Sequence, residues 1–371
     1  MHTFAPPRGM RDFYPEDFRA RDALFSAWRE TARLWGFEEY DAPVVETLDL
    51  LERKAGEEIS EQIYAFQDKS GRGLALRPEL TPSLARMIIA RQGALSFPLK
   101  WSAIAQCFRY ERMTRGRKRE HYQWNLDIVG EESVLAEAEV LGAAIAALRR
   151  LGLSHEDFRV RVGSRAVLAG LFARSGIAPE HFTALCLALD KRGKISDDQV
   201  RELLRAEGVG EADAGRVFEM LALRSLEDVD GRLAGDSAVA DLHTLFDHAR
   251  DLGFGQYLDF DLTVIRGLGY YTGIVFEAFD TAGRFRAIFG GGRYDNLLST
   301  LGGERMPCVG LGFGDVVVME LLAQLGKAPA TARGLEYAVG YMDEPSRNLA
   351  MQVAARLRAG GESCDLALAA E

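Results

Sequence analysis

FRYERMTRGRKREHYQWN, residues Phe108 to Asn125, joins two strand-like segments through a strongly basic loop. The segments from Leu99 to Glu111 and from Tyr122 to Val129 alternate or run apolar, as strands do. Six of the eighteen quoted residues are Arg or Lys, although the formal net charge of the whole chain is −10. We therefore predict a pair of strands whose connecting loop concentrates positive charge.

The charge of this loop indicates an anionic ligand. A single arginine at a hairpin tip is usually only solvated, but six crowded cations repel one another unless an anion binds between them. Arginine also binds phosphate through two parallel hydrogen bonds. A polyphosphate or a nucleic-acid backbone is thus the predicted partner, with Arg109 and Arg112 held by strand-like sequence and the other cations at the tip.

Composition places the chain among ordinary globular proteins. With 371 residues, 47% hydrophobic and 27% charged, it has room for two to three domains. No apolar run is long enough to span a membrane, and the polar start does not resemble a secretory signal. The four cysteines form no CxxC pair, which predicts a cytoplasmic protein without disulfides or a cysteine metal site. The acidic balance argues against non-specific coating of nucleic acid.

Helices and strands alternate around the basic loop. Apolar periodicity predicts helices over about Glu16–Trp35 and Glu132–Leu151. Phe37–Val45 reads as a strand interrupted by a proline, and Leu74–Glu79 as a short strand. The pair Thr81-Pro82 then supplies a helix N-cap and a first-turn proline.

The pattern changes twice farther along the chain. Residues 173–252 are helical, charged and short in aromatic residues, while strand signals return in Phe260–Phe279 and Arg284–Leu298. Leu325–Gly334 reads as a linker before a final strand–helix–strand pattern. The predicted fold class is α+β, with a core over residues 1–172 and 253–325, an all-α insertion over 173–252 and a small C-terminal α/β unit over 334–371.

Three further segments carry candidate chemistry. In RPELT, the carboxylate of Glu79 at a strand end could receive an ammonium group, whereas Thr81 alone suggests only a helix cap. In RGLGYYTG, Tyr270 and Tyr271 either pack a sheet or line a ligand that approaches the glycine backbone. GGGRYD (Gly290–Asp295) is not a dinucleotide motif, and no GxxxxGK[ST] loop occurs. Any nucleotide must therefore be bound by side chains on a sheet.

In this order the segments resemble those of the histidyl-tRNA synthetases, a family of class II aminoacyl-tRNA synthetases. FEEYDAPVVE resembles motif 1, FRYERMTRGRKREHYQWNLDIVG resembles motif 2, and RGLGYYTGIVFE and FGGGRYDNLL resemble the two histidine-specific signatures. The resemblance covers most of residues 1–325. It implies a class II antiparallel sheet flanked by helices, a homodimer formed through motif 1, and ATP with Mg²⁺, histidine and tRNA(His) as ligands. It also implies that the insertion holds the tRNA acceptor arm and that residues 334–371 begin an anticodon-binding domain.

The resemblance also implies roles for individual residues. Arg109 and Arg266 would be catalytic, spreading negative charge while the histidine carboxylate attacks the α-phosphate of ATP and pyrophosphate leaves. In related enzymes a metal ion fills the position of Arg266, so no metal ligand is assigned to a protein side chain. The remaining assignments are histidine binding by Glu79, Thr81, Gln123, Asp127, Tyr270 and Tyr271, ATP binding by Arg109, Glu111, Arg117 and Arg266, and tRNA binding by Arg115, Lys118 and Arg119.

Three departures from the family pattern stand out. Val317 occupies the position of the motif 3 arginine that touches the γ-phosphate, and Gly269 replaces a common aspartate. Some family members resemble this variant, with a similar Asp-Val-Val segment, so inactivity is not implied. The third departure is a C-terminal part shorter than the family's anticodon-binding domain. It suggests either a fragment or a lost domain, with adenylate formation retained and tRNA charging weakened.

Two other functions compete with this interpretation. The regulatory subunit of ATP phosphoribosyltransferase resembles a synthetase core without the C-terminal domain, but it tends to lose the motif 2 loop and the distinctive arginine. Glu79, Thr81, Arg109, Gln123 and Arg266 are all present in this chain, which favours the synthetase. A generic RNA-binding module would need a broad basic face, and the acidity of the rest of the chain disfavours it.

Overall fold

The two strands flanking the basic loop form a long antiparallel hairpin. In the computed structural model, β5 (Leu99–Phe108) pairs with β6 (Glu120–Val129) along its whole length. The predicted strand pair is confirmed, but the first strand ends at Phe108 rather than at Glu111. The pairing does not continue to Glu111, because the Tyr110 amide donates at 2.8 Å to the carbonyl of Gln62 and not to the partner strand.

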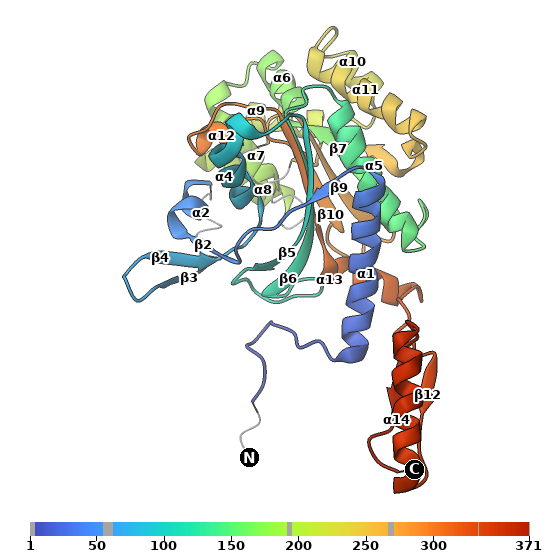
Figure 1. The fold of residues 1–371 in the computed structure, drawn as a ribbon. Coiled ribbons are helices and arrows are strands. Elements are labelled where there is room, and N and C mark those ends of the chain that lie inside the picture. The colour runs from blue at the N-terminus through green and yellow to red at the C-terminus, as the bar shows by residue number, and fades with distance from the viewer. Residues whose placement is uncertain (1–3, 55–61, 191–194, 266–270, 333, 371) are drawn as a thin grey trace. The chain divides into compact units, whose positions relative to one another are not determined.

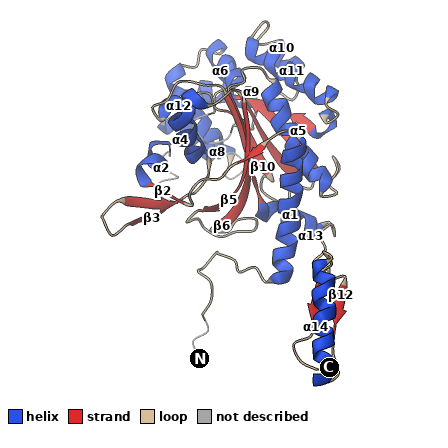
Figure 2. Ribbon diagram, in the orientation of Figure 1, coloured by secondary structure: helices blue, strands red, loops and turns tan. Residues whose placement is uncertain are grey.

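This hairpin belongs to an eight-stranded sheet that is antiparallel except at its two edges (Figure 2). The strand order is β1-β5-β6-β11-β10-β9-β7-β8, and only the β1–β5 and β7–β8 pairs are parallel. The predicted α+β class is confirmed. The other six strands are β1 (Glu38–Glu39), β7 (Phe158–Ser164), β8 (Leu258–Phe260), β9 (Ile274–Asp280), β10 (Phe289–Arg293) and β11 (Cys308–Gly314).

The structure describes residues 4–54, 62–190, 195–265, 271–332 and 334–370. Three positions singled out in the sequence, Arg266, Gly269 and Tyr270, lie outside the described residues. The chain divides into two units, one of residues up to Asp12 with Arg21–Ala328, the other of Phe13–Ala20 with residues from Pro329 onward. The second unit contains the predicted strand–helix–strand pattern as β12 (Tyr337–Val339), α14 (Glu344–Ala359) and β13 (Cys364–Leu366), with β12 and β13 parallel.

One face of the large sheet is buried under helices (Figure 1). Alternate side chains of β6, Trp124, Leu126 and Ile128, join a core shared with α1 (Pro15–Leu34) and α5 (Leu135–Arg150). In that core the ring of Trp28 stacks on that of Trp124, with the ring centroids 5.9 Å apart. Because each such side chain gains about 1.5–3 kcal/mol on burial, this face fixes the register of the sheet. The opposite face of the central strands is left for polar side chains.

The described part of residues 173–252 consists mainly of short helices. None of the described helices is both long enough and apolar enough to cross a membrane. The helices of this region and its approaches are α6 (Arg165–Arg174), α7 (Phe182–Asp190), α8 (Asp197–Ala206), α9 (Glu211–Leu221), α10 (Leu226–Asp230) and α11 (Ser237–Asp251). The other α-helices and strands of the described residues are β2 (Val45–Thr47), α2 (Leu48–Lys54), β3 (Tyr64–Gln67), β4 (Gly73–Leu76), α4 (Thr81–Arg91), α12 (Leu297–Thr300) and α13 (Asp315–Gln324).

Three predicted elements were wrong in detail. Phe37–Val45 is not one strand: the chain leaves β1 of the large sheet before Pro43 and enters β2 of a separate three-stranded sheet after it, as expected where a proline cannot donate to a ladder. Phe260–Phe279 is likewise divided between β8 and β9. Thr81 is not an N-cap, because it is already the first residue of α4 and no side chain caps that helix.

Candidate active site

A cavity of about 1290 Å³ opens on the polar side of the central strands. Its lining comes from the basic loop, from β6, β9, β10 and β11, and from the helical insertion. Of the predicted site residues, Arg109, Glu111, Arg117, Lys118 and Gln123 line it. The structure thus brings five of the predicted residues to one cavity.

Glycines on β10 and β11 form part of the cavity floor. Gly290 pairs with Gly312 in neighbouring strands, and both line the cavity. A Cβ atom on Gly312 would lie 2.5 Å from Nε2 of Gln123, and one on Gly310 would lie 2.1 Å from Oδ1 of Asp127. The alternating glycines of β11 therefore leave the space in which side chains of β6 lie across the neighbouring strand.

Replacing Gly310 by alanine is expected to destabilise the fold by about 1–3 kcal/mol, because the new methyl group overpacks a buried strand pair. It would collide with the buried Asp127 carboxylate and come within 2.9 Å of the Leu126 carbonyl. Gly314→Ala, on the same strand, is the matched control, because a Cβ atom on Gly314 would meet nothing within 4 Å. Urea denaturation of both variants measures the difference, and equal losses of stability would contradict this explanation of the glycine.

Arg109 is held at the point where the β5–β6 hairpin opens into the loop. Its Nε donates to the Pro78 carbonyl (2.9 Å), and its amide donates to the Arg119 carbonyl (2.9 Å). These contacts fix one edge of the guanidinium while the side chain still lines the cavity. Such a preorganised cation can bind a phosphate with a smaller loss of side-chain entropy than a free arginine would suffer.

Beside Arg109, the cavity contains a histidine that the sequence did not single out. Burial, with the Arg109 cation adding to it, lowers the pKa of His121 to about 3. Its imidazole is therefore neutral near pH 7 and is poorly matched to proton transfer there.

Asp127 and Tyr271 are buried and do not line the cavity. The hydroxyl of Tyr294 donates to the Asp127 carboxylate. Tyr271 and Tyr294 belong to the same apolar cluster, together with Val275 of β9. Tyr271 thus shares a cluster with the tyrosine that donates to Asp127. Tyr294, from the GGGRYD segment, was missed as the partner of Asp127.

Glu79 and Thr81 are also buried, each about 7% exposed. They follow Pro78, whose carbonyl accepts from Arg109. The cavity lining does not include either side chain. Thr81 is the first residue of α4, and Glu79 precedes it by two residues.

The loop cations have different surroundings. Arg117 forms an ion pair with the buried Glu111, and both line the cavity. The guanidinium of Arg115 lies 4.5 Å from the centre of the Phe285 ring, and that of Arg119 lies 3.9 Å from the centre of the Tyr110 ring. Of the three cations predicted to bind tRNA, Lys118 lines the cavity, whereas Arg115 and Arg119 do not.

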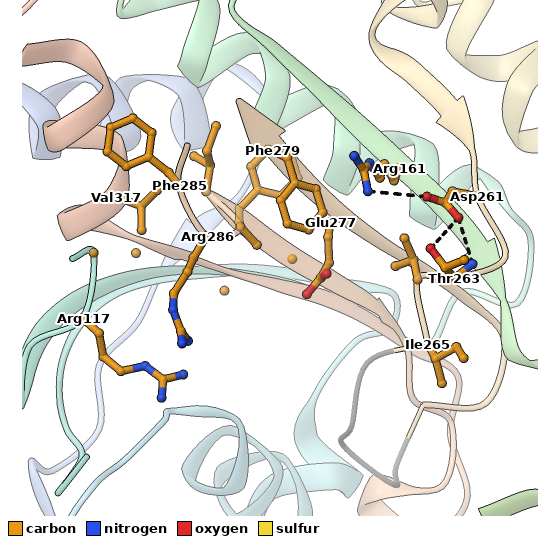
Figure 3. A pocket seen from close by; sticks show the side chains of 18 of the residues that line it. Arg117, Arg161, Asp261, Thr263, Ile265, Glu277, Phe279, Phe285, Arg286 and Val317 are labelled. Atoms are coloured by element: carbon orange, nitrogen blue, oxygen red, sulfur yellow. Dashed lines mark hydrogen bonds and ion pairs between the residues drawn. The ribbon is translucent and has the colours of Figure 1, made fainter. Parts of the chain in front are cut away.

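Several charged residues of the cavity were not predicted (Figure 3). They come from β7, β8 and the segment after it, β9, the turn before β10 and the helical insertion, and they are Arg161, Asp197, Arg224, Asp259, Asp261, Glu277 and Arg286. Figure 3 labels four of them, Arg161, Asp261, Glu277 and Arg286. Glu277 stands in the quoted TGIVFE segment and Arg286 in RFRAIF, but neither belongs to a pattern with a recognisable chemical spacing. Their meeting depends on strand register, which the sequence did not supply.

Val317 lies on α13, whose start is fixed by a buried ionic network. Asp315 accepts from the Tyr122 amide (2.9 Å), and Arg11 bridges it to Glu120 at 2.9 Å on each side. Val317 lines the cavity two residues later, so the position predicted to lack an arginine does face the site. An apolar surface stands there instead of a cation.

Comparisons with known proteins agree with this architecture. A profile of the family described as "Histidyl-tRNA synthetase" matches residues 9–314. The histidine–tRNA ligase of Arabidopsis thaliana, named chloroplastic/mitochondrial, is 47% identical over 364 residues, which are 98% of this chain and 75% of that protein.

Two solved structures share the fold. Histidyl-tRNA synthetase from Nostoc has a TM-score of 0.83 at 25% identity, over 100% of this chain and 87% of that one. A protein from Bacillus halodurans, described as an ATP phosphoribosyltransferase regulatory subunit/histidyl-tRNA synthetase, has a TM-score of 0.81 at 26% identity, over 99% of this chain and 93% of that one. From the profile match and the 47% identity, the chain belongs to the histidyl-tRNA synthetase family.

Proposed function

We propose that this chain is a histidine–tRNA ligase, an aminoacyl-tRNA synthetase that activates histidine with ATP and transfers it to tRNA(His). The observation that carries the proposal is the meeting of Arg109 and Gln123 at one cavity above the glycines of β10 and β11, in a chain of this family. A basic loop beside a floor without bulky side chains suits a flat, anionic adenylate.

In the proposed first step, the histidine carboxylate attacks the α-phosphate of ATP and pyrophosphate leaves. Arg109 lies where it can stabilise the negative charge that develops on the phosphoryl oxygens. Arg266 is proposed to share this role, and Glu79, Thr81, Gln123, Asp127, Tyr270 and Tyr271 to select histidine. The neutral His121 is consistent with a step that needs little proton transfer.

ATP is proposed to lie along the loop side of the cavity, near Arg117 and Glu111. Among the described residues no group of three His, Cys, Asp or Glu side chains is placed to hold a metal ion. Mg²⁺ commonly binds through substrate phosphates with one or two carboxylates. We therefore expect Mg²⁺ to arrive with ATP and to be held mainly by its phosphates.

The larger partners remain part of the proposal. Arg115, Lys118 and Arg119 are proposed to contact tRNA(His), helped by the helical insertion over residues 173–252. Residues 334–371 are proposed to be the first part of an anticodon-binding domain, and residues 1–172 with 253–325 to form the catalytic core. A homodimer and a cytoplasmic location also stay predictions.

The regulatory alternative is less well supported. The Bacillus halodurans protein is named for that function as well as for the synthetase. However, the Arabidopsis relative, at 47% identity, is named a histidine–tRNA ligase, and so are other curated relatives at 38–41% identity. In addition, residues of the basic loop of this chain line the cavity.

Binding of a non-hydrolysable histidyl-adenylate analogue tests the proposal without requiring turnover. Calorimetry is expected to show at least about 10²-fold tighter binding of the analogue than of histidine, because analogues of high-energy states exploit the whole site. The alanyl analogue is the matched control and should bind far more weakly. A chain that binds histidine but gains nothing from the adenylate portion would instead behave as the regulatory protein.

A further inference from the structure

The turn before β10 presents an arginine to the cavity. Five described arginines line the cavity, and the guanidinium groups of four of them contact protein acceptors. These contacts are Arg109 with the Pro78 carbonyl, Arg117 with Glu111, Arg161 with Asp261 and Arg224 with the Leu221 carbonyl. For Arg286, the described part of the chain provides no hydrogen bond or ion pair.

The backbone that carries Arg286 is nevertheless well fixed. The buried carboxylate of Asp280 accepts from the amides of Arg284 (2.9 Å) and Phe285 (3.0 Å). Two residues after Arg286, the Ile288 amide donates to the Ala278 carbonyl at 2.7 Å. Arg286 thus projects from an anchored turn, and its exposed side chain lines the cavity.

The side chain points toward another cation. Figure 3 shows the guanidinium groups of Arg286 and Arg117 directed toward one another in the cavity. Arg117 is already paired with Glu111, so Arg286 is the cation of the two to which an anionic ligand would bring a partner. Phe285, next to Arg286, also packs against Arg115 of the basic loop. The turn and the loop therefore form two neighbouring sides of the cavity.

The side of this part of the cavity that Val317 forms is apolar. Val317 lines the cavity, and its Cγ2 would lie 3.2 Å from a Cβ atom on Gly116 of the loop. An anion placed between Arg117 and Arg286 thus receives no cation from the first turn of α13. Arg286, which extends toward Arg117 in Figure 3, is placed to supply positive charge across from the loop.

We propose that Arg286, on the turn before β10, binds the terminal phosphates of the nucleoside triphosphate. It supplies the positive charge that the apolar side chain of Val317 cannot supply. The inference rests on the proposed use of ATP at this cavity. An arginine that binds only β- and γ-phosphates would contribute to ATP affinity and to the departure of pyrophosphate, but not to the binding of histidine or of AMP.

The test compares Arg286→Ala with Arg284→Ala, which removes an exposed arginine two residues away that does not line the cavity. Calorimetry measures the binding of ATP and of AMP to each variant and to the unaltered chain, with Mg²⁺ present. Loss of one charge-assisted hydrogen-bonding group should weaken ATP binding about 10- to 100-fold. AMP binding should change less than about twofold, and Arg286→Lys should recover part of the loss.

Kinetics provide the second readout. In histidine-dependent ATP–pyrophosphate exchange, Arg286→Ala should raise KM for ATP while leaving KM for histidine nearly unchanged. ATP binding equal to that of Arg284→Ala, or equal weakening of ATP and AMP, would overturn the role of Arg286. Absence of exchange in the unaltered chain would count against the proposed ligase, whereas an ATP-selective binding defect would still support the phosphate site.

Discussion

Arg109→Ala is expected to lower histidine-dependent ATP–pyrophosphate exchange by about 10²–10³-fold, mainly through kcat. The loss is of the size seen when one preorganised charge-stabilising donor is removed from an active site. Arg109 is anchored by the Pro78 carbonyl and lines the cavity where the α-phosphate is proposed to react. Because its contact with developing charge strengthens in the transition state, ATP and histidine affinities should change less than kcat.

Two further variants separate this role from general loss of positive charge. Arg112→Ala removes an exposed arginine of the same loop that does not line the cavity, and it should alter exchange less than about threefold. Arg109→Lys keeps the charge but loses the planar fork and should recover only part of the activity. If Arg109→Ala and Arg112→Ala reduce exchange equally in folded protein, Arg109 has no special role in the reaction.

Arg293→Ala is expected to destabilise the fold by about 3–5 kcal/mol, because it leaves a buried carboxylate without its partner. Glu137 of α5 is fully buried, and its two oxygens accept from Nε and Nη2 of Arg293, each at 2.7 Å. This pair ties α5 to the end of β10. Urea denaturation measures the loss, with Arg305→Ala as the control, since its ion pair with Asp295 is largely exposed on the arginine side.

The deficit of Arg293→Ala should also grow with pH. Burial raises the pKa of Glu137 even though Arg293 partly opposes that effect. Without Arg293 the folded-state pKa of Glu137 should rise further, so the folded state binds its proton more tightly than the unfolded state does. Stability is then greatest below the unfolded pKa of the carboxyl group and falls as pH rises through the folded pKa. A deficit that is the same at pH 5 and pH 8 would contradict the burial of an unpaired carboxylate.

The parts of the fold that sequence predicted correctly depend on local patterns. Alternation in β5 and β6 and the periodicity of α1 and α5 are visible within short windows, and the structure contains all four elements. The predicted cap at Thr81 failed because a capping residue type does not by itself establish the backbone conformation of a cap. In the structure Leu80 already has helical backbone angles there.

The composition of the site was predicted less completely because it depends on long-range register. β11 pairs with β6 so that Gly310 lies opposite Asp127 and Gly314 opposite Gln123. No local pattern reveals that glycines of β11 make room for side chains on a distant strand. Arg286 and Glu277 were missed for the same reason, while Arg109 and Gln123 were predicted because the motif 2 resemblance identified their positions.

Histidine-dependent ATP–pyrophosphate exchange by the unaltered chain tests the central claim most directly. We predict exchange with histidine that is at least about 10²-fold faster than with any other amino acid, since a site that hydrogen-bonds its substrate rejects analogues lacking those groups. We also predict that Arg109→Ala removes almost all of this exchange. No exchange from folded protein that still binds histidine, or exchange indifferent to the amino acid supplied, would contradict a histidine-activating site.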